Sequence, residues 1–138
     1  MILLDTNVIS ELMLAVPNPA VLAWLDQQLS DDLYICVITK AEIEWGIALL
    51  PEGKKKKRLA NASSEVLAAF GNRCLVYDCE TTLHYVAVAH CSRSSGRPMN
   101  VEDMQIAAIA KANGCTLATR NTTAFNFLPD LKLFNPWA

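Results

Sequence analysis

The chain has 138 residues, of which 52% are hydrophobic and 19% are charged, and its formal net charge is −2. This length suits one domain with a sizeable core and leaves little room for a second one. The charge balance excludes a broadly basic nucleic-acid-binding surface, although a local basic patch is compatible with it.

The start of the chain has neither the basic segment nor the cleavage site of a signal peptide, and no apolar run approaches the roughly 18 residues that cross a bilayer. The five cysteines are odd in number and form no C-x-x-C pair. We therefore expect a cytoplasmic protein that does not enter a membrane. Its cysteines should be reduced thiols and not disulfides or zinc ligands.

The first half of the chain alternates apolar runs with helical patterns, bounded by cap residues and by Pro51. The expected elements are a strand at Ile2–Leu4, a helix at Asn7–Leu14 capped by Thr6, a helix from Asn18-Pro19 to about Leu29, a strand at Leu33–Ile38 and a helix starting at Thr39.

The second half continues the alternation and ends in two short apolar runs. The expected elements are a helix at Lys54–Phe70, a strand at Leu75–Tyr77, a helix at Cys79–Ser92, a loop at Ser94–Pro98, a helix at Asn100–Asn113 closed by Gly114, and strands at Thr116–Thr119 and Leu131–Phe134. Such alternation predicts an α/β fold, with a mainly parallel central sheet and helices on both faces.

Ligands of parallel sheets bind beyond the carboxyl ends of the strands, which points to Asp5, Thr39 and the segment that begins at Thr119. Asp5 follows a buried strand, where it is either a helix cap or a functional carboxylate. Asp103 begins an apolar stripe, so it should face inward, where an unpaired charge is costly. A helix-start aspartate favoured by the macrodipole is the alternative.

Glu42 allows two interpretations. Together with Thr39 it matches a capping box, but it also precedes an apolar stripe formed by Trp45, Gly46 and Leu49. Glu44 has similar neighbours, so the spacing does not separate the two glutamates. Three acids at strand ends or helix starts, without a histidine cluster, favour Mg²⁺ or Mn²⁺ over zinc. The chemistry indicated is metal-assisted hydrolysis of a phosphate ester.

Four segments resemble the ordered motifs of PIN domains of the VapC and FitB-like group. They are Met1–Glu11 (MILLDTNVISE), Ile38–Ile47 (ITKAEIEWGI), Asp103–Ala110 (DMQIAAIA) and Leu117–Phe125 (LATRNTTAF). The ending Phe134–Trp137 (FNPW) is similar to FitB-like proteins in particular. The resemblance spans nearly the whole chain, and it implies one PIN domain at 1–138.

The resemblance implies a metal-dependent ribonuclease, the toxin of a bacterial toxin–antitoxin pair. Asp5, Glu42 and Asp103 match the acidic metal-binding positions, which selects Glu42 over Glu44. Asn7 and Thr119 match polar supporting positions and are also candidate phosphate contacts. The implied partners are an RNA substrate, a cognate antitoxin, a second copy in a homodimer, and promoter DNA bound together with the antitoxin. The first helices of such proteins often form the antitoxin groove.

The chain departs from the family pattern at the last motif. Many relatives carry a fourth acid there, and this chain has Asn121 and Ala124 in those places. Asn121 offers a carbonyl oxygen without a charge, so we expect it to help place a metal ion or a water. Whether one ion or two bind is left open. The alternative function is a catalytically weakened PIN module that binds a partner, or promoter DNA together with its antitoxin.

The basic residues include a run at Lys54–Arg58, which is either an RNA-binding patch or a solvated helix start. Arg120, beside the expected metal site, is the better candidate for a phosphate contact. Two rival enzyme classes fit less well. A haloacid-dehalogenase phosphohydrolase needs D-x-D, but Asn7 stands at the third position. A receiver domain needs a neighbouring acidic pair and a late lysine that we cannot place.

Overall fold

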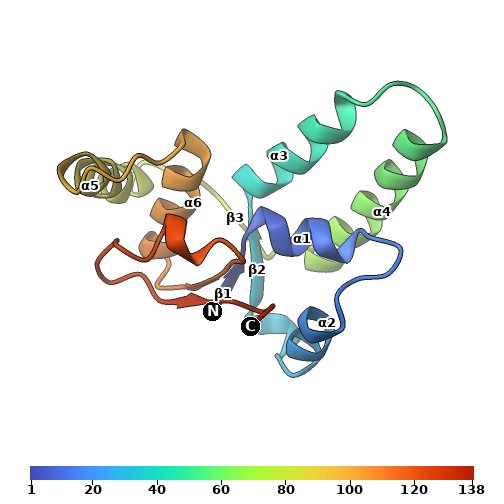
Figure 1. The fold of residues 1–138 in the computed structure, drawn as a ribbon, viewed down its shortest axis with the longest axis horizontal. Coiled ribbons are helices and arrows are strands. Elements are labelled where there is room, and N and C mark those ends of the chain that lie inside the picture. Colours follow the sequence, from blue (N-terminus) through green and yellow to red (C-terminus); the bar gives the residue numbers. More distant parts are fainter.

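The computed structural model describes residues 1–138 and contains one five-stranded sheet with helices on both faces (Figure 1). The strands are β1 (Ile2–Leu4), β2 (Leu33–Cys36), β3 (Cys74–Leu75), β4 (Thr116–Ala118) and β5 (Leu133–Phe134). The α-helices are α1 (Thr6–Leu12), α2 (Pro19–Asp26), α3 (Val37–Ala48), α4 (Lys54–Phe70), α5 (Thr81–Ser94) and α6 (Val101–Ala112), and two 3₁₀ helices are η1 (Ser30–Asp32) and η2 (Thr122–Ala124).

The sheet has the strand order β3-β2-β1-β4-β5, and every pair is parallel. The expected parallel α/β fold is therefore confirmed. The chain builds outward from β1 to β2 and β3, then crosses to the other side of β1 to form β4 and β5. This reversal places a topological switch point beside β1, where α/β folds bind ligands.

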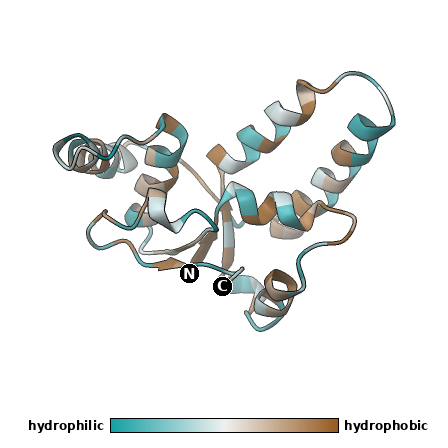
Figure 2. Cartoon of the chain, in the orientation of Figure 1, coloured by the Kyte–Doolittle hydropathy of each residue, from teal (hydrophilic) through white to brown (hydrophobic).

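Alternating side chains divide the core into two layers, because successive residues of a strand point to opposite faces. Leu3, Cys36 and Leu117 lie in the cluster that packs with α5 and α6. Their neighbours Leu4 and Ala118 belong to the cluster formed with α1 to α4. Figure 2 shows apolar residues along the central strands and on the helices at both sides of the sheet.

Most differences from the expected elements are shifts of one to three residues at their ends. Two differences bear on the candidate site. The cap of α1 is Asp5 and not Thr6, because the Asp5 Oδ1 accepts a hydrogen bond of 2.7 Å from the Thr6 backbone N–H. The helix α3 begins at Val37, directly after β2, so Thr39 lies inside the helix and the expected Thr39–Glu42 capping box is wrong.

Other local signals are confirmed. Asn18 caps α2 through a bond of 2.8 Å from the Ala20 backbone N–H, with Pro19 at the first helical position. Gly114 follows α6 with φ +64°, the left-handed conformation expected of it. All five cysteines are unpaired thiols. None of the helices is both long and apolar enough to cross a membrane.

Candidate active site

An open pocket of about 460 Å³ lies at the carboxyl edge of the sheet, beside β1 and β4. Nine of its eleven lining residues are polar or charged. It is lined by Asp5, Thr6, Asn7, Ser10, Glu11, Leu14, Glu42, Asp103, Arg120, Asn121 and Trp137. The pocket therefore brings together side chains that are up to 132 positions apart in the sequence (Asp5 to Trp137). It includes all three acids that the sequence indicated.

Asp5 is held by the backbone of β1 and by two neighbouring side chains. Its backbone N–H donates to the Ala118 carbonyl at 2.9 Å, which continues the pairing of β1 with β4 past the strand end. The Asp5 Oδ2 accepts from the Thr119 hydroxyl at 2.7 Å and from the Asn7 amide at 3.3 Å. Asp5 is consequently both a helix cap and a rigidly oriented carboxylate, so the two interpretations of this residue are compatible.

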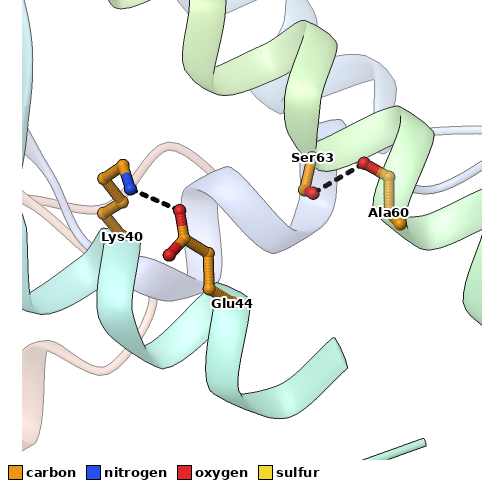
Figure 3. Close-up of polar contacts among 4 residues, drawn as sticks. All are labelled: Lys40, Glu44, Ala60 and Ser63. Atoms are coloured by element: carbon orange, nitrogen blue, oxygen red, sulfur yellow. Dashed lines mark hydrogen bonds and ion pairs between the residues drawn. The ribbon is translucent and has the colours of Figure 1, made fainter. Parts of the chain in front are cut away.

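Glu42 lies in the second turn of α3 and points to α1. Its Oε1 accepts from the Thr6 hydroxyl at 2.9 Å, and that hydroxyl also lies 3.1 Å from the Thr39 hydroxyl. Glu44 is exposed and pairs with Lys40 on the outer side of the same helix (Figure 3). The structure thus separates the two glutamates, which sequence spacing alone did not.

The stripe expected after Glu42 is not a buried face. Trp45 is 65% exposed and Leu49 is 64% exposed. Glu42 therefore faces the pocket because α3 starts at the end of β2 and its second turn passes α1, not because it precedes a core-facing stripe. Asp103, by contrast, does precede a buried face, because Ile106, Ala107 and Ala110 are fully buried.

Asp103 occupies the first turn of α6, and this turn lies at the carboxyl edge because α6 runs back toward the start of β4. Its backbone N–H donates to the Asn100 Oδ1 at 2.7 Å, which caps the helix. Burial raises the pKa of the Asp103 carboxyl to about 6, and the negative charges of Asp5 and Glu42 add to the effect.

The carboxyl groups of Asp5 and Glu42 are also less acidic than usual. Burial raises the pKa of Asp5, against the opposing hydrogen bonds from Thr119 and Thr6. Burial likewise raises the pKa of Glu42, and the charge of Asp5 contributes to the rise. Neither these two nor Asp103 forms an ion pair with a lysine or arginine, because the only two salt bridges lie elsewhere. The cluster therefore has repulsion without a compensating cation.

The donor set fits a hard divalent cation. It consists of carboxylate, hydroxyl and amide oxygens, the ligands that Mg²⁺ and Mn²⁺ prefer. No three acidic, histidine or cysteine side chains lie close enough to hold one ion together directly. An ion in this pocket would thus contact only some of the carboxylates directly and reach the others through waters, a mode that Mg²⁺ commonly adopts.

Of the four other residues that the sequence indicated, three line the pocket and one lies behind it. Asn7 links the site, because its amide donates to the Thr119 hydroxyl at 3.2 Å and its Oδ1 accepts from the Arg120 backbone N–H at 3.3 Å. Thr119 is fully buried and does not line the pocket, so its hydroxyl supports Asp5 instead of facing a phosphate. Asn121 and Arg120 are exposed at the rim and line it.

Sequence reasoning missed several lining residues, notably Thr6, Ser10, Glu11 and Trp137. Ser10 and Glu11 follow Asn7 by three and four residues on α1, so helical spacing would have placed them on the same face as Asn7. Nothing in the local sequence brings Trp137 to the pocket, because its approach depends on β5 pairing with β4. The run Lys54–Arg58 lies at the start of α4, and Lys55 lines a second groove that shares residues with the pocket.

Fold and site together define an α/β protein with an acidic pocket at the switch point of a parallel sheet. The sequence matches the family model described as "PIN domain" over residues 2–127. Three curated relatives align over 138 residues: a plasmid stability protein StbB of Pseudomonas syringae pv. tomato (46% identity; 99% of both chains), a VapC ribonuclease of Sinorhizobium fredii (42%; 99% of this chain and 98% of that one) and the toxin FitB of Neisseria gonorrhoeae (42%; 99% of both).

Two solved structures share the fold over nearly the whole chain. A structure of FitAB bound to a DNA fragment has a TM-score of 0.91 at 41% identity and covers 100% of this chain and 96% of that one. A crystal structure of FitAcB from Neisseria gonorrhoeae has a TM-score of 0.90 at 41% identity and covers 99% of both chains. The chain belongs to the PIN-domain family, in the group that contains the VapC and FitB toxins.

Proposed function

We propose that this chain is an endoribonuclease toxin that hydrolyses RNA phosphodiester bonds with Mg²⁺ or Mn²⁺. One observation carries the proposal: the carboxylates of Asp5, Glu42 and Asp103, from three separate elements, meet at one pocket and none of them forms an ion pair. Such an arrangement is costly unless a cation occupies it. Membership of the group that contains a VapC ribonuclease supports the choice of RNA as substrate.

In this proposal Asp5, Glu42 and Asp103 hold the ion, directly or through waters, and Asn121 uses its amide to place a water. A bound ion would neutralise charge on the phosphodiester and make a water more acidic. Thr6 and Thr119 fix two of the carboxylates by the bonds described above, so these donors should retain the geometry as the charge in the pocket changes.

Arg120 is the basic residue in the lining of the pocket, and we assign its guanidinium to a substrate phosphate. Asn7 has a second role in this scheme. Its Oδ1 holds the backbone of Arg120 while its amide holds Asp5, so it fixes the distance between the phosphate contact and the metal ligands. The two functions of the pocket, holding the ion and holding the substrate, thus share one linking side chain.

A small antitoxin is the proposed partner. The groove beside the pocket has an apolar floor that includes Met13, Ile43, Ile47 and Leu59, and it shares Glu42 with the acidic pocket. An apolar segment bound there would lie directly beside the proposed metal ligands. The related FitAB and FitAcB structures support a proteinaceous partner, and the DNA-bound FitAB structure supports promoter DNA as a ligand of the pair.

The first test uses purified protein freed of any bound antitoxin, incubated with a pool of cellular RNAs and Mn²⁺, Mg²⁺ or EDTA. We expect cutting with either metal and none with EDTA. Asp5→Asn and Asp103→Asn should abolish cutting. Glu42→Gln should reduce it strongly, whereas Glu44→Gln on the outer face of the same helix is the matched control and should retain it. Equal cutting by all variants would reveal a contaminating nuclease and contradict the proposal.

The second candidate is a PIN module that binds its antitoxin and promoter DNA without cutting RNA. Two observations favour it: Asn121 and Ala124 supply no fourth acid, and no three carboxylates converge closely enough to share an ion directly. A thermal-shift titration with Mn²⁺ separates the candidates. The enzyme should be stabilised by Mn²⁺ and the Asp5→Asn variant should not, whereas the non-cutting module predicts no shift in either.

A further inference from the structure

Trp137 is one of two apolar residues in the lining of the acidic pocket; the other is Leu14. The guanidinium carbon of Arg120 lies 5.2 Å from the centre of the Trp137 indole ring, in a cation–π contact. Arg120 forms no ion pair, although several acids line the same pocket. Its guanidinium is therefore directed by an aromatic face and not by a carboxylate.

The C-terminal segment that carries Trp137 is firmly held. The Thr119 backbone N–H donates to the Phe134 carbonyl at 2.9 Å, so this segment lies beside the one that carries Arg120. The Trp137 backbone N–H donates to the Asn135 Oδ1 at 2.9 Å, and Pro136 between them is buried. The indole also packs against the core cluster of the α1–α4 face. Trp137 is thus a fixed support for the exposed Arg120 side chain.

A cation held in a fixed position would favour the binding of RNA to this acidic pocket. Four acidic side chains line it (Asp5, Glu11, Glu42 and Asp103), so an RNA phosphate entering the pocket meets a negative potential. Arg120 is the one basic side chain in the lining. A guanidinium that lies on an aromatic ring keeps the N–H groups at its edge free, and these match the oxygens of a phosphate.

We propose that Trp137 is a positioning residue for the substrate, because it holds the Arg120 guanidinium where it contacts an RNA phosphate next to the scissile bond. The inference rests on the ribonuclease function proposed above. Trp137 does not serve as a stacking platform for a base, since Arg120 covers the ring on one side and the core packs against it on another.

The test measures steady-state cutting of a short RNA by Trp137→Ala, Trp137→Phe and Arg120→Ala. Trp137→Ala should raise KM roughly threefold to tenfold with little change in kcat, because the lost contact acts on binding. Trp137→Phe, which keeps an aromatic face, should recover part of the loss. Arg120→Ala should raise KM at least as much, and adding Trp137→Ala to it should have no further effect.

Binding in EDTA provides a readout that does not depend on cutting. Fluorescence anisotropy with a 2′-O-methyl oligoribonucleotide should show weaker binding by Trp137→Ala. The slope of the logarithm of its affinity against the logarithm of salt concentration should fall by the amount that corresponds to about one phosphate contact. Trp24→Phe is the matched control. Trp24 stacks on Phe134 of the same C-terminal segment at 5.1 Å but does not line the pocket, so it reports general loosening of that segment.

Two results overturn the inference while leaving the proposed function intact. One is a Trp137→Ala protein with wild-type KM and salt dependence, and the other is a Trp24→Phe protein that reproduces the whole Trp137→Ala defect. Wild-type protein that neither binds the oligonucleotide nor cuts RNA refutes the proposed function itself, and this inference with it.

Discussion

The carboxyl group of Asp103 is half-buried at the start of α6, and its pKa is raised from 3.8 to about 6 by desolvation first and by the charges of Asp5 and Glu42 next. The folded protein therefore binds this proton more tightly than the unfolded chain does. The contribution of Asp103 to stability is full below pH 3.8 and is lost as the pH rises toward 6, as long as no metal is bound.

We therefore predict that Asp103→Asn stabilises the metal-free protein at pH 7. Solvent screening of the partly exposed group reduces the gain to on the order of 1 kcal/mol. The gain should disappear in acid, where wild-type Asp103 is protonated. Urea unfolding in EDTA at several pH values measures it, with Asp31→Asn on the exposed helix η1 as the control. A variant less stable than wild type at pH 7 would contradict the account.

Thr6 allows a second prediction at the scale of one side chain. Its hydroxyl donates to Glu42 at 2.9 Å, and valine has the same shape without this donor. Thr6→Val should lower the rate of RNA cutting about tenfold, because a hydrogen bond to a charged group is worth about 1.5 kcal/mol. Thr6→Ser should restore most of the rate. Thr82→Val on α5 is the control, and a Thr6→Val protein as active as that control would refute the role.

At the scale of elements, the site depends on where three helices begin. Asp5 caps α1, α3 follows β2 without a loop, and Asn100 caps α6 so that Asp103 lies in its first turn. In a parallel sheet the connecting helices run antiparallel to the strands. A helix therefore begins at the carboxyl edge whether it follows a strand or precedes one. All three carboxylates therefore meet at that edge.

The cap of α6 allows a matched comparison. Asn100→Ala should reduce stability by about 1 kcal/mol, as losses of such caps do. It should also weaken Mn²⁺ binding, since Asp103 loses the bond between its backbone and the Asn100 side chain. Asn18→Ala removes the equivalent cap of α2 and should cost similar stability without affecting the metal. Isothermal titration with Mn²⁺ alongside urea unfolding distinguishes them, and equal Mn²⁺ affinities would refute the coupling.

At the scale of the whole molecule, two exposed apolar patches lie outside the site and its groove. Trp45 and Leu49 protrude from α3, and Leu83 and Val86 protrude from α5 with exposures of 74% and 65%. Exposed apolar side chains at helical spacing on two elements favour a protein–protein contact. We propose that a second copy of the chain covers them, in agreement with the homodimer implied by the family resemblance.

Light scattering after size exclusion tests this proposal. The wild-type chain should have the mass of a dimer, and Leu83→Glu should shift it to the monomer because a charge at the interface loses its hydration. Glu80→Leu at the N-cap of α5 is the opposite change, from a charged to an apolar side chain, and it should not dissociate the dimer. A wild-type monomer at micromolar concentration would contradict the proposal.

Local sequence patterns predicted much of this architecture. The apolar runs at β1, β2 and β4, the cap at Asn18-Pro19 and the left-handed Gly114 all depend on neighbours in the chain, and each is confirmed. The buried stripe after Asp103 is confirmed for the same reason. Errors arose where two local signals competed, as at Thr39, where the chain passes from β2 into α3 two residues earlier than the capping pattern predicted.

The sequence by itself determined the parallel α/β fold, the three acidic residues and the likeness to PIN domains, because periodicity and motif order are properties of the chain alone. Only the tertiary structure decided that Glu42 faces the pocket while Glu44 faces outward, that Thr119 supports Asp5 from a fully buried position, and that Trp137 contacts Arg120. The contacts of Thr6 with Glu42, Asp5 with Thr119 and Arg120 with Trp137 join residues 17 to 114 positions apart. Strand pairing and helix packing, not local sequence, bring such residues together.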